Sequence, residues 1–214
     1  MRGLLCAIAL LTLGDGCGGD DEPSTSGSDE CENVEAPAPR ESGTLTAPTD
    51  PLAEGTSYGL VFETICGSFT VALDTELAPN TSASLVALAR EGFYDDTIFH
   101  RIVPDFVIQA GDPTQTGMGG PGYKTVDVPP AGSKYVKGVV AMAKTEVEAP
   151  GTSGSQFFVV TGDDVGLPPD YAIVGEVTEG IDTVEHIGTL GIPGHPTGAP
   201  SEPVVISSVT VTES

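Results

Sequence analysis

The chain has 214 residues, with 31 acidic and 8 basic side chains and a formal net charge of −23 at pH 7. So negative a surface repels phosphate backbones and anionic lipid headgroups, which argues against binding nucleic acid or a membrane surface by charge. The 28 glycines, 18 prolines and 6% aromatic residues indicate a loop-rich β protein of one domain with extensions.

The first 17 residues have the pattern of a signal peptide. One arginine precedes an apolar run from Leu4 to Leu13, which is too short to span a bilayer as a mature helix. The following residues, LGDGC, resemble a bacterial lipoprotein cleavage box in which Cys17 becomes the lipidated first residue. Asp15 does not fit that box, which favours small uncharged residues. Ordinary secretory cleavage nearby, or a misassigned start methionine, therefore stays open as the alternative.

Residues 18–55 are expected to be a disordered, acidic tether that precedes a folded domain at 56–214. The stretch has almost no large apolar side chains and no hydrophobic period, so it cannot bury enough surface to fold. It carries ten acidic residues against Arg40 alone. We therefore expect a flexible linker between the amino terminus and the domain.

Four cysteines have to be assigned. Cys6 leaves with the signal peptide and Cys17 is the candidate for lipidation, so Cys31 in the tether and Cys66 in the domain remain. In an exported protein two such cysteines suggest a disulfide that fixes the tether to the domain. Two free thiols are the alternative.

The folded part begins with two apolar stretches, 58–64 and 68–73, which predict a β-hairpin. A helix is expected to start within 78–82 and to end at Gly92, because proline suits a first turn and leucines recur on one face. Further strands are expected at 138–143, 155–161, 171–177 and 204–211, with an amphipathic helix from 180 to 187. About eight strands and two helices suit a closed eight-stranded antiparallel barrel with helices at its ends.

One segment, FHRIVPDFVIQAGD at 99–112, carries an unusual charge. Apolar residues alternate from Phe106 to Ala110, and a shorter apolar piece precedes Pro104, so two short strands are expected around Arg101. An arginine in such a segment is rarely buried unless it is paired or faces a ligand. Arg101 is therefore either a rim arginine held by an acid such as Asp112, or part of a binding site.

A second segment decides between these alternatives. Together, FHRIVPDFVIQAGD and GTSGSQFFVV at 151–160 resemble the two signature segments of the cyclophilin-type peptidyl-prolyl isomerases, over roughly 58–212. The resemblance implies a mainly β, cyclophilin-like barrel that rotates X-Pro peptide bonds without a cofactor. One departure is the segment AKTEVEAP at 143–150, which is longer and more acidic than the family's usual Ala-Asn-Ala-Gly-Pro.

The resemblance also assigns roles. Arg101 takes the place of the catalytic arginine, with Phe106 and Gln109 as its catalytic neighbours. Phe157 and Phe99 are expected in the ordinary core. The three histidines and the cysteines have no metal-ligand spacing, and His100 is expected to form structural hydrogen bonds. The residues expected to bind substrate are Val107, Ala143, Lys144, Gln156, Phe158, Leu167 and Tyr171.

The expected function is therefore isomerisation of X-Pro bonds in exported proteins. A catalytically weak module that binds proline segments, or a tethered chaperone, is the alternative. The expected partners are proline-containing polypeptides, and the chain is expected to act as a monomer. It would reach the membrane only through a lipid on Cys17, as a periplasmic or cell-surface lipoprotein, or else be secreted and soluble.

Overall fold

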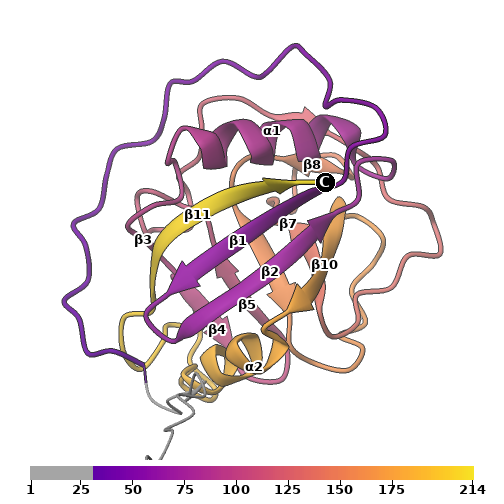
Figure 1. Cartoon of the computed structure of the whole chain (residues 1–214). Helices are drawn as coiled ribbons and strands as arrows, with labels where there is room; N and C mark the ends of the chain where they lie inside the picture. Colours follow the sequence, from indigo (N-terminus) through magenta and orange to yellow (C-terminus); the bar gives the residue numbers. More distant parts are fainter. Residues whose placement is uncertain (1–30) are drawn as a thin grey trace, which may run out of the picture.

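The computed structural model describes residues 31–214, which form eleven strands and two helices (Figure 1). The predicted signal peptide, Cys17 and the first part of the predicted tether lie outside the described residues. Every predicted strand and helix is present near its expected position; β3, β6 and β8 were missed because two residues are too few to show an alternation. The elements are β1 (Tyr58–Thr64), β2 (Gly67–Leu73), α1 (Pro79–Arg90), β3 (Thr97–Ile98), β4 (Arg101–Val103), β5 (Val107–Ala110), β6 (Thr125–Val126), β7 (Val139–Met142), β8 (Thr152–Ser153), β9 (Phe157–Val160), β10 (Ile173–Glu179), α2 (Ile181–Thr189) and β11 (Val205–Glu213). Neither helix is long and apolar enough to cross a membrane.

Nine strands form one antiparallel sheet in the order β3-β11-β1-β2-β10-β7-β9-β5-β4, and β6 pairs separately with β8. The mainly β fold with two helices is confirmed, but the prediction of a closed eight-stranded barrel is wrong. The sheet is an open half-barrel with more strands.

The sheet stays open because its two edge strands follow one another in the chain. Only Phe99 and His100 separate β3 from β4, so these strands continue each other instead of pairing. Across the gap, the Phe99 N–H donates to the Val204 carbonyl (2.9 Å) and the Ile102 N–H to the Gly198 carbonyl (2.7 Å). Irregular backbone before β11 thus occupies the place of a closing strand.

The strands β4, β5, β7 and β9 have apolar side chains on both faces. On β9, Phe157 and Val159 belong to the main core, while Phe158 and Val160 belong to a second apolar cluster, so all four are buried. The helices α1 and α2 lie at opposite ends of the sheet (Figure 1). Phe99 and Phe157 are core residues, as expected. The second cluster consists of the buried residues Val107, Tyr135, Ala141, Phe158 and Val160.

Helix α1 receives its cap from a distant residue. Its N-cap residue, Ala78, forms no side-chain capping hydrogen bond. The Asp127 carboxylate, which is 8% exposed, accepts the Thr81 N–H (2.7 Å) and hydroxyl (2.6 Å) and the Asn80 side-chain amide (2.8 Å). An anion at a helix amino terminus also favours the helix dipole. This cap therefore fixes the chain after β6 against α1.

Residues 31–55 form no helix or strand, yet they differ from the flexible tether predicted for 18–55. Cys31 forms a disulfide with Cys66, and the Glu32 N–H donates to the Ile65 carbonyl (2.8 Å). From there the segment runs along the outside of the domain to β1 (Figure 1). Composition did not predict this order, because the segment is held by a covalent bond and backbone hydrogen bonds and not by apolar burial.

We predict that replacing both Cys31 and Cys66 with serine lowers the free energy of unfolding. The bridge spans a sequence separation of 35 residues, for which chain entropy gives about 3–4 kcal/mol. Urea unfolding of the variant beside the wild type measures the difference. Thiol labelling of denatured, unreduced wild-type protein should leave both residues unmodified, and labelling at both would contradict the bridge.

Candidate active site

A tight turn orients the two strands that carry the predicted catalytic residues. Strands β4 and β5 pair with Arg101 opposite Gln109, and the Phe106 N–H donates to the Val103 carbonyl (3.1 Å) across the turn. In this turn Pro104 is the second residue and Asp105 the third. Asp105 adopts a φ of 56°, and a positive φ at the third residue is what a type II turn requires. Because of this turn, Phe106 leaves the alternation predicted from Phe106 to Ala110 and packs on the second cluster.

The register of the sheet brings the key side chains into one row. Arg101 on β4 lies opposite Gln109 on β5, which lies opposite Phe158 on β9 and then Ala141 on β7. Directly opposed residues share a face of the sheet. A charged group and an amide therefore lie beside the second apolar cluster, away from the main core.

A cavity of about 250 Å³ opens on this face. It contains every residue that the sequence assigned to catalysis or substrate binding, except Gln156. Its lining is Arg101, Phe106, Val107, Gln109, Ala143, Lys144, Phe158, Leu167 and Tyr171. Residues from five separate parts of the chain thus converge on one site.

Arg101 is half-buried, and its guanidinium lies 5.7 Å from the centre of the Phe106 ring, within the range of a cation–π contact. Burial lowers the pKa of Arg101, an effect that the nearby Tyr171 phenol opposes. An arginine starts so far above neutrality that it stays protonated. Within residues 31–214 it forms no ion pair, so its charge remains available to a ligand.

Asp112, the acid considered as a partner for Arg101, has a different role. Its carboxylate accepts hydrogen bonds from Thr114 N–H (2.7 Å) and hydroxyl (2.8 Å) and from Thr116 N–H (3.1 Å) and Gly117 N–H (2.6 Å). Although burial acts to raise the pKa of Asp112, these bonds lower it below the usual value. Asp112 therefore organises the loop after β5, and the interpretation of Arg101 as an acid-held rim residue is wrong.

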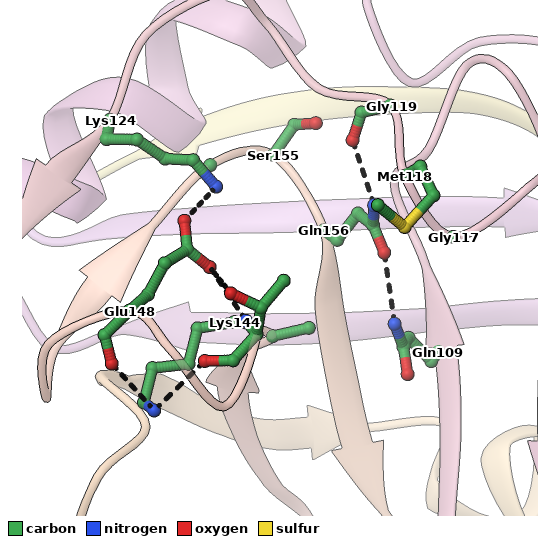
Figure 2. Close-up of a pocket in the computed structure, with 12 residues that line it drawn as sticks. Gln109, Gly117, Met118, Gly119, Lys124, Lys144, Glu148, Ser155 and Gln156 are labelled. Atoms are coloured by element: carbon green, nitrogen blue, oxygen red, sulfur yellow. Dashed lines mark hydrogen bonds and ion pairs between the residues drawn. The ribbon is translucent and has the colours of Figure 1, made fainter.

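Two amides connect this loop to the cavity. The Gln109 Nε2 donates to the Gln156 Oε1 (3.0 Å), and the Gln156 Nε2 donates to the Gly119 carbonyl (2.8 Å), as Figure 2 shows. Gln156 does not line the main cavity but holds Gln109, which does. It is thus a positioning residue for Gln109.

A smaller cavity of about 110 Å³ adjoins the first and shares Gln109, Ala143 and Lys144 with it. Figure 2 shows the ion pair between Lys124 and Glu148 (2.9 Å) at its wall. Burial acts to raise the pKa of Glu148, but the hydrogen bonds from Lys124 and Thr145 lower it to about 2. This pair was not predicted from the sequence, although the acidic departure at 143–150 was a signal for it.

Lys144 and Tyr171 face each other at the cavity, with the ammonium 5.3 Å from the centre of the ring. Tyr135, a buried residue that was not predicted from the sequence, holds Tyr171 in place. Its hydroxyl donates to the Tyr171 carbonyl (2.7 Å) and accepts the Tyr171 N–H (3.0 Å). The Ala143 N–H is already bonded to the Gln156 carbonyl (2.9 Å).

His100 was expected to form structural hydrogen bonds, and this is wrong. Both ring nitrogens are buried and have no hydrogen-bond partner in the described part of the chain. Burial lowers the pKa of His100; the Asp112 carboxylate opposes this change and Arg101 adds to it. Burial therefore favours the neutral form of this ring next to Arg101.

Among residues 31–214, one group of three metal-ligand side chains lies close together, and it consists of Cys31, Cys66 and His186. The His186 Nε2 is 3.4 Å from the Cys31 Sγ. Because the two sulfur atoms are bonded to each other, they do not offer the thiolates that a metal would bind. The group is therefore a disulfide beside a histidine.

Comparisons with known proteins agree with this geometry. A sequence model of the family described as "Cyclophilin type peptidyl-prolyl cis-trans isomerase/CLD" matches residues 60–211. The chain is 41% identical to the peptidyl-prolyl cis-trans isomerase-like 1 of Aspergillus fumigatus over 61% of its length and 82% of that protein. It is 39% identical to the probable peptidyl-prolyl cis-trans isomerase A of Mycobacterium leprae, over 68% of this chain and 87% of that one.

A solved structure is similar as well. It is a cyclophilin type peptidyl-prolyl cis-trans isomerase of Cryptosporidium parvum, in the presence of the dipeptide Ala-Pro. Its TM-score is 0.65 and its identity 30%, over 72% of this chain and 98% of that one. The chain therefore belongs to the cyclophilin-type peptidyl-prolyl cis-trans isomerase family, and the predicted enzyme class is confirmed.

The lowered pKa of His100 predicts a stability that depends on pH. The unfolded chain, with a histidine pKa near 6.5, binds a proton before the folded chain does, so the free energy of unfolding falls as pH drops below about 6.5. His100→Gln should flatten this slope between about pH 7 and pH 5. Urea unfolding at each pH measures it. Exposed His195→Gln is the control and should keep the wild-type slope; an unchanged slope in His100→Gln would contradict the assignment.

Proposed function

We propose that this isomerase acts on X-Pro bonds of exported polypeptides and that Arg101 is the group that stabilises the rotating amide. One observation carries the proposal. A half-buried guanidinium that has no acidic partner in the described chain lies at the wall of a cavity that is also lined by Phe106, Val107, Phe158 and Leu167. A cation and an apolar cup are the two features that a proline amide under rotation needs.

The reaction breaks no bond. Rotation about an X-Pro amide loses resonance, with a barrier of ~18–20 kcal/mol, and leaves a lone pair localised on the prolyl nitrogen. A donor directed at that nitrogen binds the twisted amide more tightly than either planar form, and this difference in binding is the catalysis. A guanidinium suits the task because it is always protonated and presents its donors in a rigid fork.

The apolar lining gives the proline ring its place. Phe106, Val107, Phe158 and Leu167 would hold the ring, while the carbonyl before it swings through the opening of the cavity. Gln109, fixed by Gln156, would orient Arg101 and the substrate backbone. Beyond the cup, Ala143, Lys144 and Tyr171 are the groups nearest to the flanking peptide. The chemistry needs no general base and no metal.

We predict that Arg101→Ala lowers kcat/KM for a proline tetrapeptide at least about tenfold, since one charge-assisted donor contributes about 1.5–3 kcal/mol. Arg101→Lys should restore little, because a point ammonium does not reproduce the fork. A protease-coupled assay on an Ala-Pro tetrapeptide measures the rates. Arg90→Ala, which removes an exposed guanidinium paired with Glu213, is the matched control and should keep the wild-type rate.

An Arg101→Ala protein with a wild-type circular dichroism spectrum and a wild-type rate would contradict the mechanism. A wild-type protein that binds the peptide but does not accelerate its isomerisation would favour the alternative function, a proline-binding module or tethered chaperone. Arg101 is half-buried and has no ion-pair partner in the described chain. This supports the isomerase over the alternative, since a module that only binds proline segments has no need of such a cation.

We propose further that the enzyme works outside the cytoplasm as a lipoprotein anchored through Cys17. The apolar run before Cys17 supports export, and the disulfide between Cys31 and Cys66 suits an oxidising compartment. Acyl chains contribute about 0.8 kcal/mol per buried methylene, so two or more give lasting attachment. The acidic residues after Cys17 would hold the domain away from an anionic leaflet.

Cys17→Ser is predicted to release the protein into the soluble extracytoplasmic fraction with unchanged isomerase activity. The reason is that an acyl anchor contributes membrane affinity, while the substitution changes no residue that lines the cavity. Fractionation and mass spectrometry of the amino terminus measure the effect, with Cys6→Ser as the control that should stay in the membrane. A wild-type protein that is already soluble, with an unlipidated terminus, would mean that Asp15 prevents lipidation and that the enzyme is secreted.

A further inference from the structure

The segment between the disulfide and β1 crosses the outside of the domain and meets the loop that follows β5. We call residues 32–45 the strap and residues 112–122 the loop. In Figure 1 the strap is the indigo segment that leaves the end of the domain at α2 and rises to the end at α1. Its lower end is fixed by Cys31–Cys66 and by the bond from Glu32 to Ile65.

The strap bonds to the loop along its length. The Arg40 N–H donates to the Pro113 carbonyl (2.8 Å), and the Gln115 Nε2 donates to the Pro37 carbonyl (2.8 Å). Further along the strap, the Gly43 N–H donates to the Gly120 carbonyl (2.8 Å), and the Leu45 N–H donates to the Pro121 carbonyl (2.9 Å).

The same loop carries part of the active site. The Gly119 carbonyl accepts from Gln156, and Gly117, Met118 and Gly119 line the smaller cavity. Two consecutive carbonyls of the loop thus accept hydrogen bonds from different partners. The Gly119 carbonyl accepts from the Gln156 amide, which holds Gln109, and the Gly120 carbonyl accepts from the Gly43 N–H of the strap. The peptide that joins Gly119 to Gly120 therefore connects the strap to Gln156.

We propose that the strap is a positioning element of the isomerase site. By fixing Gly120 and Pro121 it fixes the Gly119 carbonyl, which orients Gln156 and, through it, Gln109 beside Arg101. The disulfide keeps the strap in place at its other end. This inference rests on the proposed roles of Arg101 and Gln109, and it adds residues 32–45, which touch no substrate, to the parts that determine the rate.

Gly43 gives the sharpest variant. A Cβ at this position would lie 2.9 Å from the Pro121 carbonyl oxygen and 3.2 Å from its carbon, both of them backbone atoms that do not move aside. The side chain of Gly43→Val therefore clashes with the loop backbone and weakens the contact between the strap and the loop. Ser42→Val places the same side chain one residue earlier, at an exposed position, and is the matched control. Gln115→Gly is a milder second variant, because it removes the bond to Pro37 and a φ of 60° suits glycine.

Three readouts separate positioning from plain stability. Hydrogen exchange at the Gly43 and Leu45 amides reports release of the strap. Side-chain amide resonances of Gln156 and Gln109 report the site, and kcat and KM are measured well below the unfolding temperature. Gly43→Val should speed exchange, shift the Gln156 signals and lower kcat/KM by about 3–30-fold, the usual range for coupling through a packed network. Gln115→Gly should act in the same direction, and Ser42→Val should match the wild type.

The full chain with Cys31→Ser, Cys66→Ser and Gly43→Val releases the strap at both ends, so it tests the proposal even if Gly43→Val alone stays docked. Free exchange of the strap amides together with wild-type kcat/KM and wild-type Gln156 signals would overturn the proposal. An inactive wild type would instead refute the proposed function. In that case the Gln156 resonances still decide whether the strap positions the site.

Discussion

The candidate site depends on a charged guanidinium that is kept half-buried at the wall of its cavity and that has no acidic partner within residues 31–214. A cation removed from water is normally paired or hydrogen-bonded. Here the acid that the sequence suggested as a partner, Asp112, accepts four hydrogen bonds within its own loop. Arg101 is left with the Phe106 ring, whose face attracts a cation weakly, and with a position from which a substrate amide can be reached.

The open sheet makes this arrangement possible because it carries apolar side chains on both faces. One face of β4, β5, β7 and β9 packs on the main core, and the other face of β5, β7 and β9 contributes to the second cluster at the cavity. Rigid strands therefore support the site from behind, with the Gly119, Gln156 and Gln109 contacts holding it from the side. The disulfide and the strap extend this support to a segment that has no regular structure of its own.

The sequence predicted much of the site, since Arg101 and the aromatic residues lie in dense motifs and strand alternation separates Phe157 from Phe158. It failed where the cause lies far away in the chain. Asp127 caps α1 through Thr81, which lies 46 residues earlier in the chain. Tyr135 holds Tyr171, and Lys124 pairs with Glu148 at the wall of the smaller cavity. The strap is held by the disulfide to Cys66 and by hydrogen bonds to Ile65 and to the loop, and no local sequence pattern in the strap encodes these bonds.

The central claim is that Arg101 acts on the twisted amide and not on the bound ground states. Nuclear magnetic resonance exchange measurements on a proline peptide give both its dissociation constant and its isomerisation rate on the enzyme. The account predicts that Arg101→Ala leaves the dissociation constant within about threefold of wild type, while the rate on the enzyme falls at least about tenfold. A loss confined to the dissociation constant, with a wild-type rate on the enzyme, would contradict it.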